Sequence, residues 1–201
     1  MECVKSGFIK PIFFIFALCA HSNCNSQKRG IDTKNIDPTY LTEYEDMKKV
    51  NTKDNIITTE VKDSTNQVFK INELSKDHIS IIKLWATWCA PCIETMPEFQ
   101  RLKEQYEWNK HIKFYTVSLD HKFDHWIEMI RKRDWKVDHY YAGSNSKSQI
   151  YQLAYEVIEQ MVTIALPNYV VLDRNGKLKE NIITDGNAET VLNELLITIS
   201  K

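Results

Sequence analysis

The sequence lacks a strong net charge, a long apolar run and any internal repeat or low-complexity segment. Its formal charge is −1 at pH 7, whereas nucleic-acid-binding domains are usually strongly basic, so we expect no nucleic-acid partner. Its longest apolar run, residues 11–20, is shorter than the roughly 20 residues that a membrane-spanning helix needs. With 43% hydrophobic and 26% charged residues, the composition is that of a globular domain with a real core.

The N-terminus has the pattern of a secretory signal peptide. Lysines precede the apolar run, and small and polar residues follow it. We therefore expect a signal peptide over residues 1–23 and a protein exported to the periplasm or cell envelope. Cys24 directly follows this leader and resembles the acylated first residue of a bacterial lipoprotein. The three residues before it are not of the usual lipoprotein type, so a lipid anchor at Cys24 and simple cleavage both remain open.

Cysteine is scarce, and only one pair belongs to the expected fold. Of five cysteines, Cys3 and Cys19 lie in the leader and Cys24 lies behind it, which leaves Cys89 and Cys92. A secreted domain stapled by disulfides carries several separated pairs. A bridge that spans only two residues removes little entropy from the unfolded chain. We therefore expect the pair to serve chemistry rather than stability.

The apolar patterns predict one α/β domain behind a polar tether. Residues 24–55 are polar, with a short helix expected near 41–50. A continuous apolar run at 78–86 predicts a buried central strand. The other expected strands are 56–61 and 67–71, which form an N-terminal β-hairpin, then 111–119, 168–172 and 177–183. The expected helices are 93–106, kinked by Pro97, then 126–133, 147–160 and 188–199. This order predicts a central mixed β-sheet flanked by helices on both faces.

The segment Trp88-Cys89-Ala90-Pro91-Cys92 joins the central strand to the next helix. Cys89 therefore lies at a helix N-terminus, which favours the thiolate, and the thiolate is the nucleophile in disulfide exchange. Cys92 follows one turn later and can resolve a mixed disulfide. Pro91 suits the first helical turn and stiffens the pair, and Trp88 offers a flat apolar surface to a partner.

Three other interpretations of the two cysteines are possible. Half of a zinc site would need a second Cys/His pair of suitable spacing, and His121 and His125 are distant along the chain. Two buried structural thiols do not explain the strand-to-helix position. A metallochaperone-like module that binds Cu(I) with the same thiolates remains the main alternative. We expect no metal and no cofactor besides a redox-active Cys89–Cys92 disulfide.

Residues 84–99 (LWATWCAPCIETMPEF) resemble the active-site segment of the thioredoxin superfamily, most closely its exported TlpA-like and ResA-like branch. Residues 166–177 (LPNYVVLDRNGK) resemble the later signature, in which a cis-proline faces the two cysteines. The resemblance covers about residue 56 to the C-terminus and implies a thioredoxin-like domain at 56–201. It also implies a cis bond before Pro167 and a substrate-binding backbone at Leu166.

The sequence departs from that family at several positions. Lys83 occupies the strand position at which thioredoxins carry a buried acid. Its amine favours the thiolate electrostatically, or carries a proton if burial depresses its pKa, or extends to a surface carboxylate, and these alternatives remain open. Ala90 replaces the commoner glycine, so the redox potential cannot be borrowed. Residues 157–165 are longer and more apolar than the family's link, and predict extra helix or a grip for a partner. A peroxidase is a remoter reading because no threonine stands three residues before Cys89.

The sequence thus predicts a TlpA/ResA-type thiol–disulfide oxidoreductase that reduces or exchanges disulfides of exported proteins. Cys89 attacks, Cys92 resolves, and a thiol donor in the membrane or envelope re-reduces the pair. Analogy with the family favours reduction over oxidation. The supporting residues are Trp88, Ala90, Pro91 and Lys83, and the substrate-binding residues are Leu166 and Pro167.

Overall fold

The computed structural model describes residues 38–158, 161–183 and 188–199 of the chain. The expected signal peptide and the candidate lipid anchor at Cys24 lie outside the described residues. All described residues belong to one unit, Asp32–Lys201. None of the described helices is long and apolar enough to cross a membrane.

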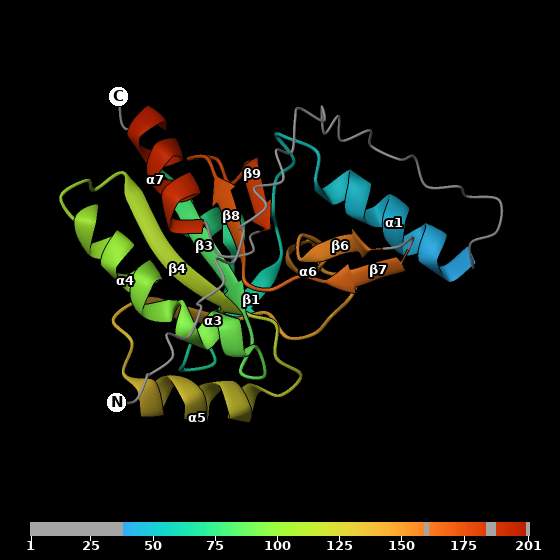
Figure 1. Cartoon of the computed structure of the whole chain (residues 1–201), viewed down its shortest axis with the longest axis horizontal. Helices are drawn as coiled ribbons and strands as arrows, with labels where there is room; N and C mark the ends of the chain where they lie inside the picture. Colours follow the sequence, from blue (N-terminus) through green and yellow to red (C-terminus); the bar gives the residue numbers. More distant parts are fainter. Residues whose placement is uncertain (1–37, 159–160, 184–187, 200–201) are drawn as a thin grey trace, which may run out of the picture. The chain divides into compact units, whose positions relative to one another are not determined.

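A mixed sheet of seven strands forms the centre of this unit, in the order β2-β1-β5-β4-β3-β8-β9 (Figure 1). β3 runs parallel to β4 and antiparallel to β8. Six of its seven residues are buried, as expected for a central strand. The strands of this sheet are β1 Glu60–Lys62, β2 Val68–Lys70, β3 Ile79–Trp85, β4 Ile112–Ser118, β5 Asp138–Tyr141, β8 Asn168–Leu172 and β9 Leu178–Ile183.

Helices cover both faces of the sheet. One apolar cluster joins β3 and β4 to α3, α4, α5 and α7, and a second joins the opposite face to α1, α2 and α6. The helices are α1 Pro38–Val50, α2 Ile71–Leu74, α3 Ala90–Glu94, α4 Met96–Gln105, α5 Phe123–Arg133, α6 Gln149–Gln152 and α7 Ala188–Ile199. This arrangement confirms the expected α/β architecture and its two helical layers.

The expected kink at Pro97 is a break between two helices. Thr95 ends α3 and begins α4, with φ −89° and ψ 3°. Pro97 lies in the first turn of α4, where a missing backbone N–H costs no helical hydrogen bond. The break leaves α3 as a short helix that carries the cysteines, and α4 as the helix that packs on the sheet through Met96, Phe99 and Leu102.

The prediction of a helix at 147–160 is wrong, and so is the prediction of extra helix at 157–165. Within the described residues of these ranges only α6 is helical, and the chain then forms a separate antiparallel pair, β6 Tyr155–Ile158 and β7 Met161–Ile164. β-branched residues recur on both strands, and such residues favour strands over helices. Strand β5 was also missed, because its four residues are exposed or half-buried and form no apolar run.

The N-terminal hairpin is present but shorter than expected. β1 and β2 pair antiparallel, and β1 joins the sheet through Lys62 opposite Tyr141. Ile56 lies outside β1 and makes one isolated bridge to Lys177. The limits of the tether stay a prediction, but its described part contributes α1, whose last residue Val50 is buried in the second cluster.

Candidate active site

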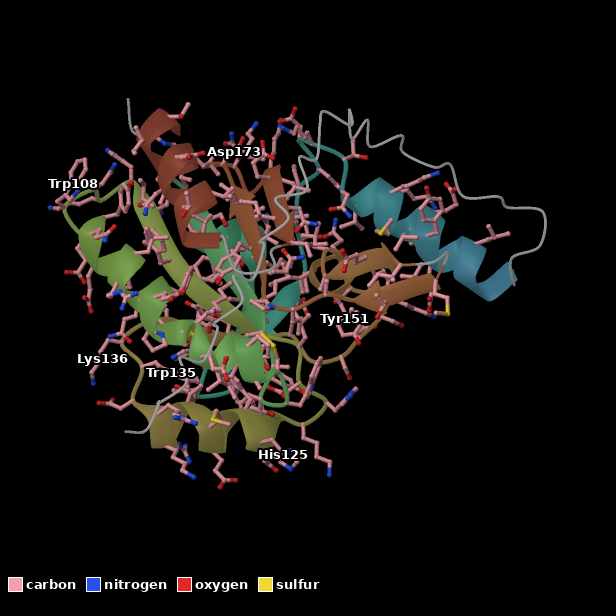
Figure 2. The ribbon with its side chains drawn as sticks, viewed as in Figure 1. Trp108, His125, Trp135, Lys136, Tyr151 and Asp173 are labelled. Atoms are coloured by element: carbon pink, nitrogen blue, oxygen red, sulfur yellow. A yellow bond between two sulfur atoms is a disulfide. The ribbon has the colours of Figure 1, made fainter. Side chains whose placement is uncertain are left out.

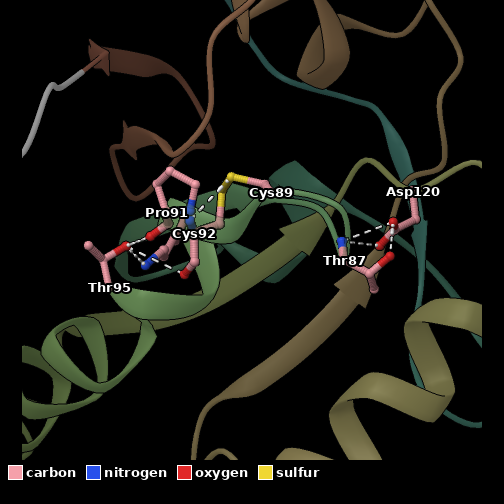
Figure 3. The surroundings of a disulfide bond; sticks show 7 residues. Thr87, Cys89, Pro91, Cys92, Thr95 and Asp120 are labelled. Atoms are coloured by element: carbon pink, nitrogen blue, oxygen red, sulfur yellow. Dashed lines mark hydrogen bonds between the residues drawn. A yellow bond between two sulfur atoms is a disulfide. The ribbon is translucent and has the colours of Figure 1, made fainter.

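Cys89 and Cys92 form a disulfide bond at the start of α3 (Figure 3). Cys89 is the N-cap residue of this helix. Its backbone N–H donates to the Ala86 carbonyl at 3.1 Å, and its carbonyl accepts from the Ile93 N–H at 3.2 Å. The Cys92 N–H donates to Cys89 Sγ at 3.2 Å. The strand-to-helix turn therefore places one sulfur against the first turn of the helix, as the sequence predicts.

The two cysteines differ in their access to solvent. Cys92 is fully buried, whereas Cys89 retains 5% exposure. Trp88 is 56% exposed beside it, and Ala90 and Pro91 are exposed on its other side. A partner that reaches the disulfide therefore meets Cys89 first, over a surface formed by these three residues.

A buried carboxylate holds the chain just before the cysteines. Both Asp120 oxygens accept from the Thr87 N–H, at 3.0 and 3.1 Å, and Oδ1 also accepts from Thr87 Oγ1 at 2.7 Å (Figure 3). The Ser118 hydroxyl donates to Oδ2 at 2.7 Å. Asp120 is only 2% exposed. The carboxylate thus fixes the segment that leads from β3 into Cys89.

Sequence reasoning missed Asp120. The available signal was its position directly after the second strand, since β3 and β4 are parallel and neighbouring parallel strands end at the same edge of a sheet. An acid at that point therefore comes close to the turn that carries the cysteines.

Lys83 is fully buried on β3, and its amine points to the other end of the short helix. Its Nζ donates to Thr95 Oγ1 at 2.9 Å. It also lies 5.8 Å from the centre of the Phe99 ring and 5.6 Å from that of Tyr169. Burial lowers the pKa of Lys83 to about 7, against an opposing effect of the Glu98 carboxylate. The structure thus places the amine in the protein interior, bonded to Thr95, rather than at a surface carboxylate.

The peptide bond between Leu166 and Pro167 is cis, as the resemblance implied. Pro167 is buried and directly precedes β8, the strand next to β3. Leu166 is half-buried and contacts both apolar clusters. The substrate-binding role of these two residues stays a prediction.

The described part of the chain contains no group of three or more His, Cys, Asp or Glu side chains that could hold a metal ion. His121 shares a 2.7 Å hydrogen bond with the Ser144 hydroxyl, and His125 lies exposed on the outer side of α5 (Figure 2). In the disulfide-bonded state the two sulfurs are joined to each other, so the structure gives no support to the Cu(I) alternative.

The chain is similar in sequence to a known thioredoxin and in sequence and fold to a solved oxidoreductase structure. Thioredoxin 2 of Chlorobaculum tepidum is 33% identical over 45 residues, which are 22% of this chain and 41% of that protein. The match therefore spans less than half of this relative. A solved putative thiol-disulfide oxidoreductase of Bacteroides vulgatus is 26% identical, with a TM-score of 0.52, and the alignment covers 68% of this chain and 85% of that one.

The fold extends to more distant structures. The exposed lipoprotein thioredoxin of Streptococcus pneumoniae strain TIGR4 is 17% identical, with a TM-score of 0.52 and coverage of 68% of this chain and 96% of that one. The fold is thus thioredoxin-like, as the sequence predicts. A model of the AhpC/TSA family matches residues 52–181, which is most of the sequence, and this chain belongs to that family.

Proposed function

We propose that this protein is a thiol–disulfide oxidoreductase that reduces or exchanges disulfide bonds of exported proteins. The observation that carries the proposal is the Cys89–Cys92 disulfide at the start of α3, in which Cys89 keeps 5% exposure and Cys92 is fully buried. The family match and the solved oxidoreductase of similar fold support the same activity.

The geometry supports a two-step exchange. In the reduced protein, the Cys89 thiolate attacks a sulfur of the substrate disulfide, forms a mixed disulfide and releases the first substrate thiolate. Cys92 then attacks Cys89 Sγ, forms the intramolecular disulfide seen here and releases the second substrate thiolate. The hydrogen bond from the Cys92 N–H to Cys89 Sγ stabilises negative charge on the attacking sulfur.

The order of attack follows from burial. Only Cys89 has exposed surface, and the aromatic face of Trp88 beside it offers contact area to a polypeptide. Cys92 is fully buried, so it reacts only with a disulfide already formed at Cys89. The difference in burial supports Cys89 as the nucleophile and Cys92 as the resolving thiol.

The setting of the reaction belongs to the same proposal. The leader pattern at residues 1–23 supports export to the periplasm or cell envelope, with Cys24 as the candidate lipid anchor. There we propose that a thiol donor of the membrane or envelope returns the pair to the dithiol state. The TlpA/ResA type of oxidoreductase fits this setting and the motif at 84–99.

The redox potential of the Cys89–Cys92 couple, measured by equilibration with glutathione buffers, tests the proposal. A value of about −270 mV supports a reductase, whereas a value of about −120 mV reverses the direction and indicates disulfide formation. The absence of a reversible couple would overturn the proposed activity. Cys92→Ser should accumulate mixed disulfides with substrate proteins, and Cys89→Ser should accumulate none.

A further inference from the structure

Lys83 shares a face of β3 with residues that pack around the disulfide. Its strand neighbours on that face, Ile81 and Trp85, belong to the apolar cluster that contains Cys89 and Cys92. The Lys83 side chain is itself fully buried. Burying an amine costs free energy unless its hydrogen bonds are satisfied. The Lys83 amine lies on the side of the sheet that carries the disulfide.

Two hydrogen bonds connect this amine with the helix that carries the cysteines. Lys83 Nζ donates to Thr95 Oγ1 at 2.9 Å, and Thr95 Oγ1 donates to the Pro91 carbonyl at 2.7 Å. The Cys92 carbonyl lies 3.4 Å from the same hydroxyl oxygen. Thr95 is half-buried, so its hydroxyl links the amine both to the cysteine motif and to the surface.

The titratable groups around Lys83 come from three neighbouring elements. Glu98 of α4 favours the charged amine, although burial outweighs it and lowers the pKa of Lys83 to about 7. Tyr169 of β8 faces the amine with its ring, 5.6 Å away. His139 of β5 bonds to Thr116, the β4 residue opposite Lys83, and burial lowers the pKa of His139 to about 4. Near neutral pH, therefore, the charge of Lys83 changes while that of His139 does not.

We infer that Lys83, held by Thr95, is a positioning residue for the exchange reaction, and that its amine takes up the proton that balances the thiolate formed on reduction. This inference rests on the proposed function. It gives the buried lysine a role that a purely structural side chain would not have, since its charge state follows the redox state of the cysteines.

The step balances with a dithiol as electron donor. The Cys89–Cys92 bond breaks, and the two donor sulfurs form a disulfide. The donor releases two protons with its two electrons. One proton goes to Cys92 Sγ and the other to the neutral Lys83 amine, which leaves Cys89 as a thiolate and Lys83 as an ammonium. The site therefore keeps the same net charge before and after reduction.

The test is the redox potential measured against pH in dithiothreitol buffers, for the wild-type full chain and for Lys83→Met. At pH values at which Cys89 is a thiolate in both reduced proteins, the wild-type protein should take up one more proton on reduction than the variant. Its equilibrium constant should then change by a further tenfold per pH unit, which is about 29.6 mV for a two-electron couple. The fraction of Cys89 thiolate, followed by ultraviolet absorbance, should fall about tenfold in the variant at pH 7.

Lys179→Met is the matched control, because Lys179 is partly exposed on β9 and pairs with Asp54 and Asp173. It should leave the pH profile and the thiolate fraction unchanged. Thr95→Val tests the same link without touching the amine, and should move both readouts in the direction of Lys83→Met, whereas Thr95→Ser should restore them.

Equal pH slopes and equal thiolate fractions in wild type and Lys83→Met would overturn the inference while leaving the proposed function intact. If Lys83→Met does not fold, unchanged readouts in Thr95→Val overturn it instead. A wild-type protein without a reversible couple refutes the proposed function itself, so the two failures are distinguishable.

Discussion

Replacing Lys83 by Met should stabilise the oxidised protein at neutral pH. The side chain is fully buried, and burial lowers the pKa of its amine from 10.5 to about 7. At any pH between these values the unfolded chain binds more protons than the folded one, so stability rises with pH across this window. Met fills a similar volume without a charge and is free of this cost.

The magnitude follows from the pKa difference. One pKa unit corresponds to about 1.36 kcal/mol, so the lowered pKa of Lys83 makes charging it in the fold at pH 7 cost roughly 4 kcal/mol, as an upper limit. The variant also loses the hydrogen bond to Thr95, which lowers its free energy of unfolding by about 1 kcal/mol. We therefore expect Lys83→Met to raise the free energy of unfolding by about 1–3 kcal/mol at pH 7.

Urea unfolding of the disulfide-bonded protein at pH 7 and pH 9 provides the assay. The wild-type free energy of unfolding should increase by roughly 2 kcal/mol more than that of Lys83→Met between these pH values. Lys179→Met is the control, because it removes a lysine from a partly exposed ion pair. Its free energy of unfolding should increase between pH 7 and pH 9 as much as that of the wild type. If wild type and Lys83→Met gain equally between the two pH values, the amine is not titrating in the fold and the reasoning is refuted.

Three further predictions concern other parts of the chain. Burial lowers the pKa of His139 from 6.5 to about 4, so the unfolded state binds more protons than the folded state between these pH values. The free energy of unfolding in urea should therefore fall by about 2 kcal/mol from pH 7 to pH 5. This pH dependence should be lost in His139→Phe and kept in His125→Phe. Gly176 has φ +74°, and an added Cβ would lie 2.5 Å from Asn72 Cβ, so Gly176→Ala should lower the free energy of unfolding in urea by about 2 kcal/mol or more. Trp88→Ala should reduce turnover of a protein disulfide roughly tenfold with an unchanged redox potential, and a shifted potential would contradict a role in contact alone.

The parts of the fold that the sequence predicts well are those set by local patterns. Five of the seven residues of β3 are apolar, as is typical of a buried central strand. The Asp173–Lys177 turn contains Asn-Gly, and it joins β8 and β9 as expected. Cys89 lies at the helix start because the strand, the turn and Pro91 follow one another without a gap. In each case the deciding residues are neighbours in the chain.

The parts that could not be predicted depend on partners distant in sequence. The segment 155–164 is short and largely apolar, and such a segment is compatible with a helix or a strand until its packing is known. β5 is specified by its pairing with β4 and β1 rather than by its own residues. α1 begins before the expected short helix, and its place in the core depends on contacts of Val50 with apolar residues of later elements.

The candidate site adds a relation that no local pattern contains. A threonine flanks the cysteine pair on each side, and each hydroxyl meets a buried charged residue: Thr87 bonds to Asp120, and Thr95 to Lys83. The carboxylate follows β4 and the amine lies on β3, so the two bonds hold the two ends of the cysteine segment to neighbouring strands of the sheet. Burying both charged groups costs free energy. The two threonines in the sequence do not reveal that each of them bonds to a buried charged residue. The different positions of the two charged groups support a division of labour, in which the carboxylate fixes the approach to Cys89 and the amine responds to its charge.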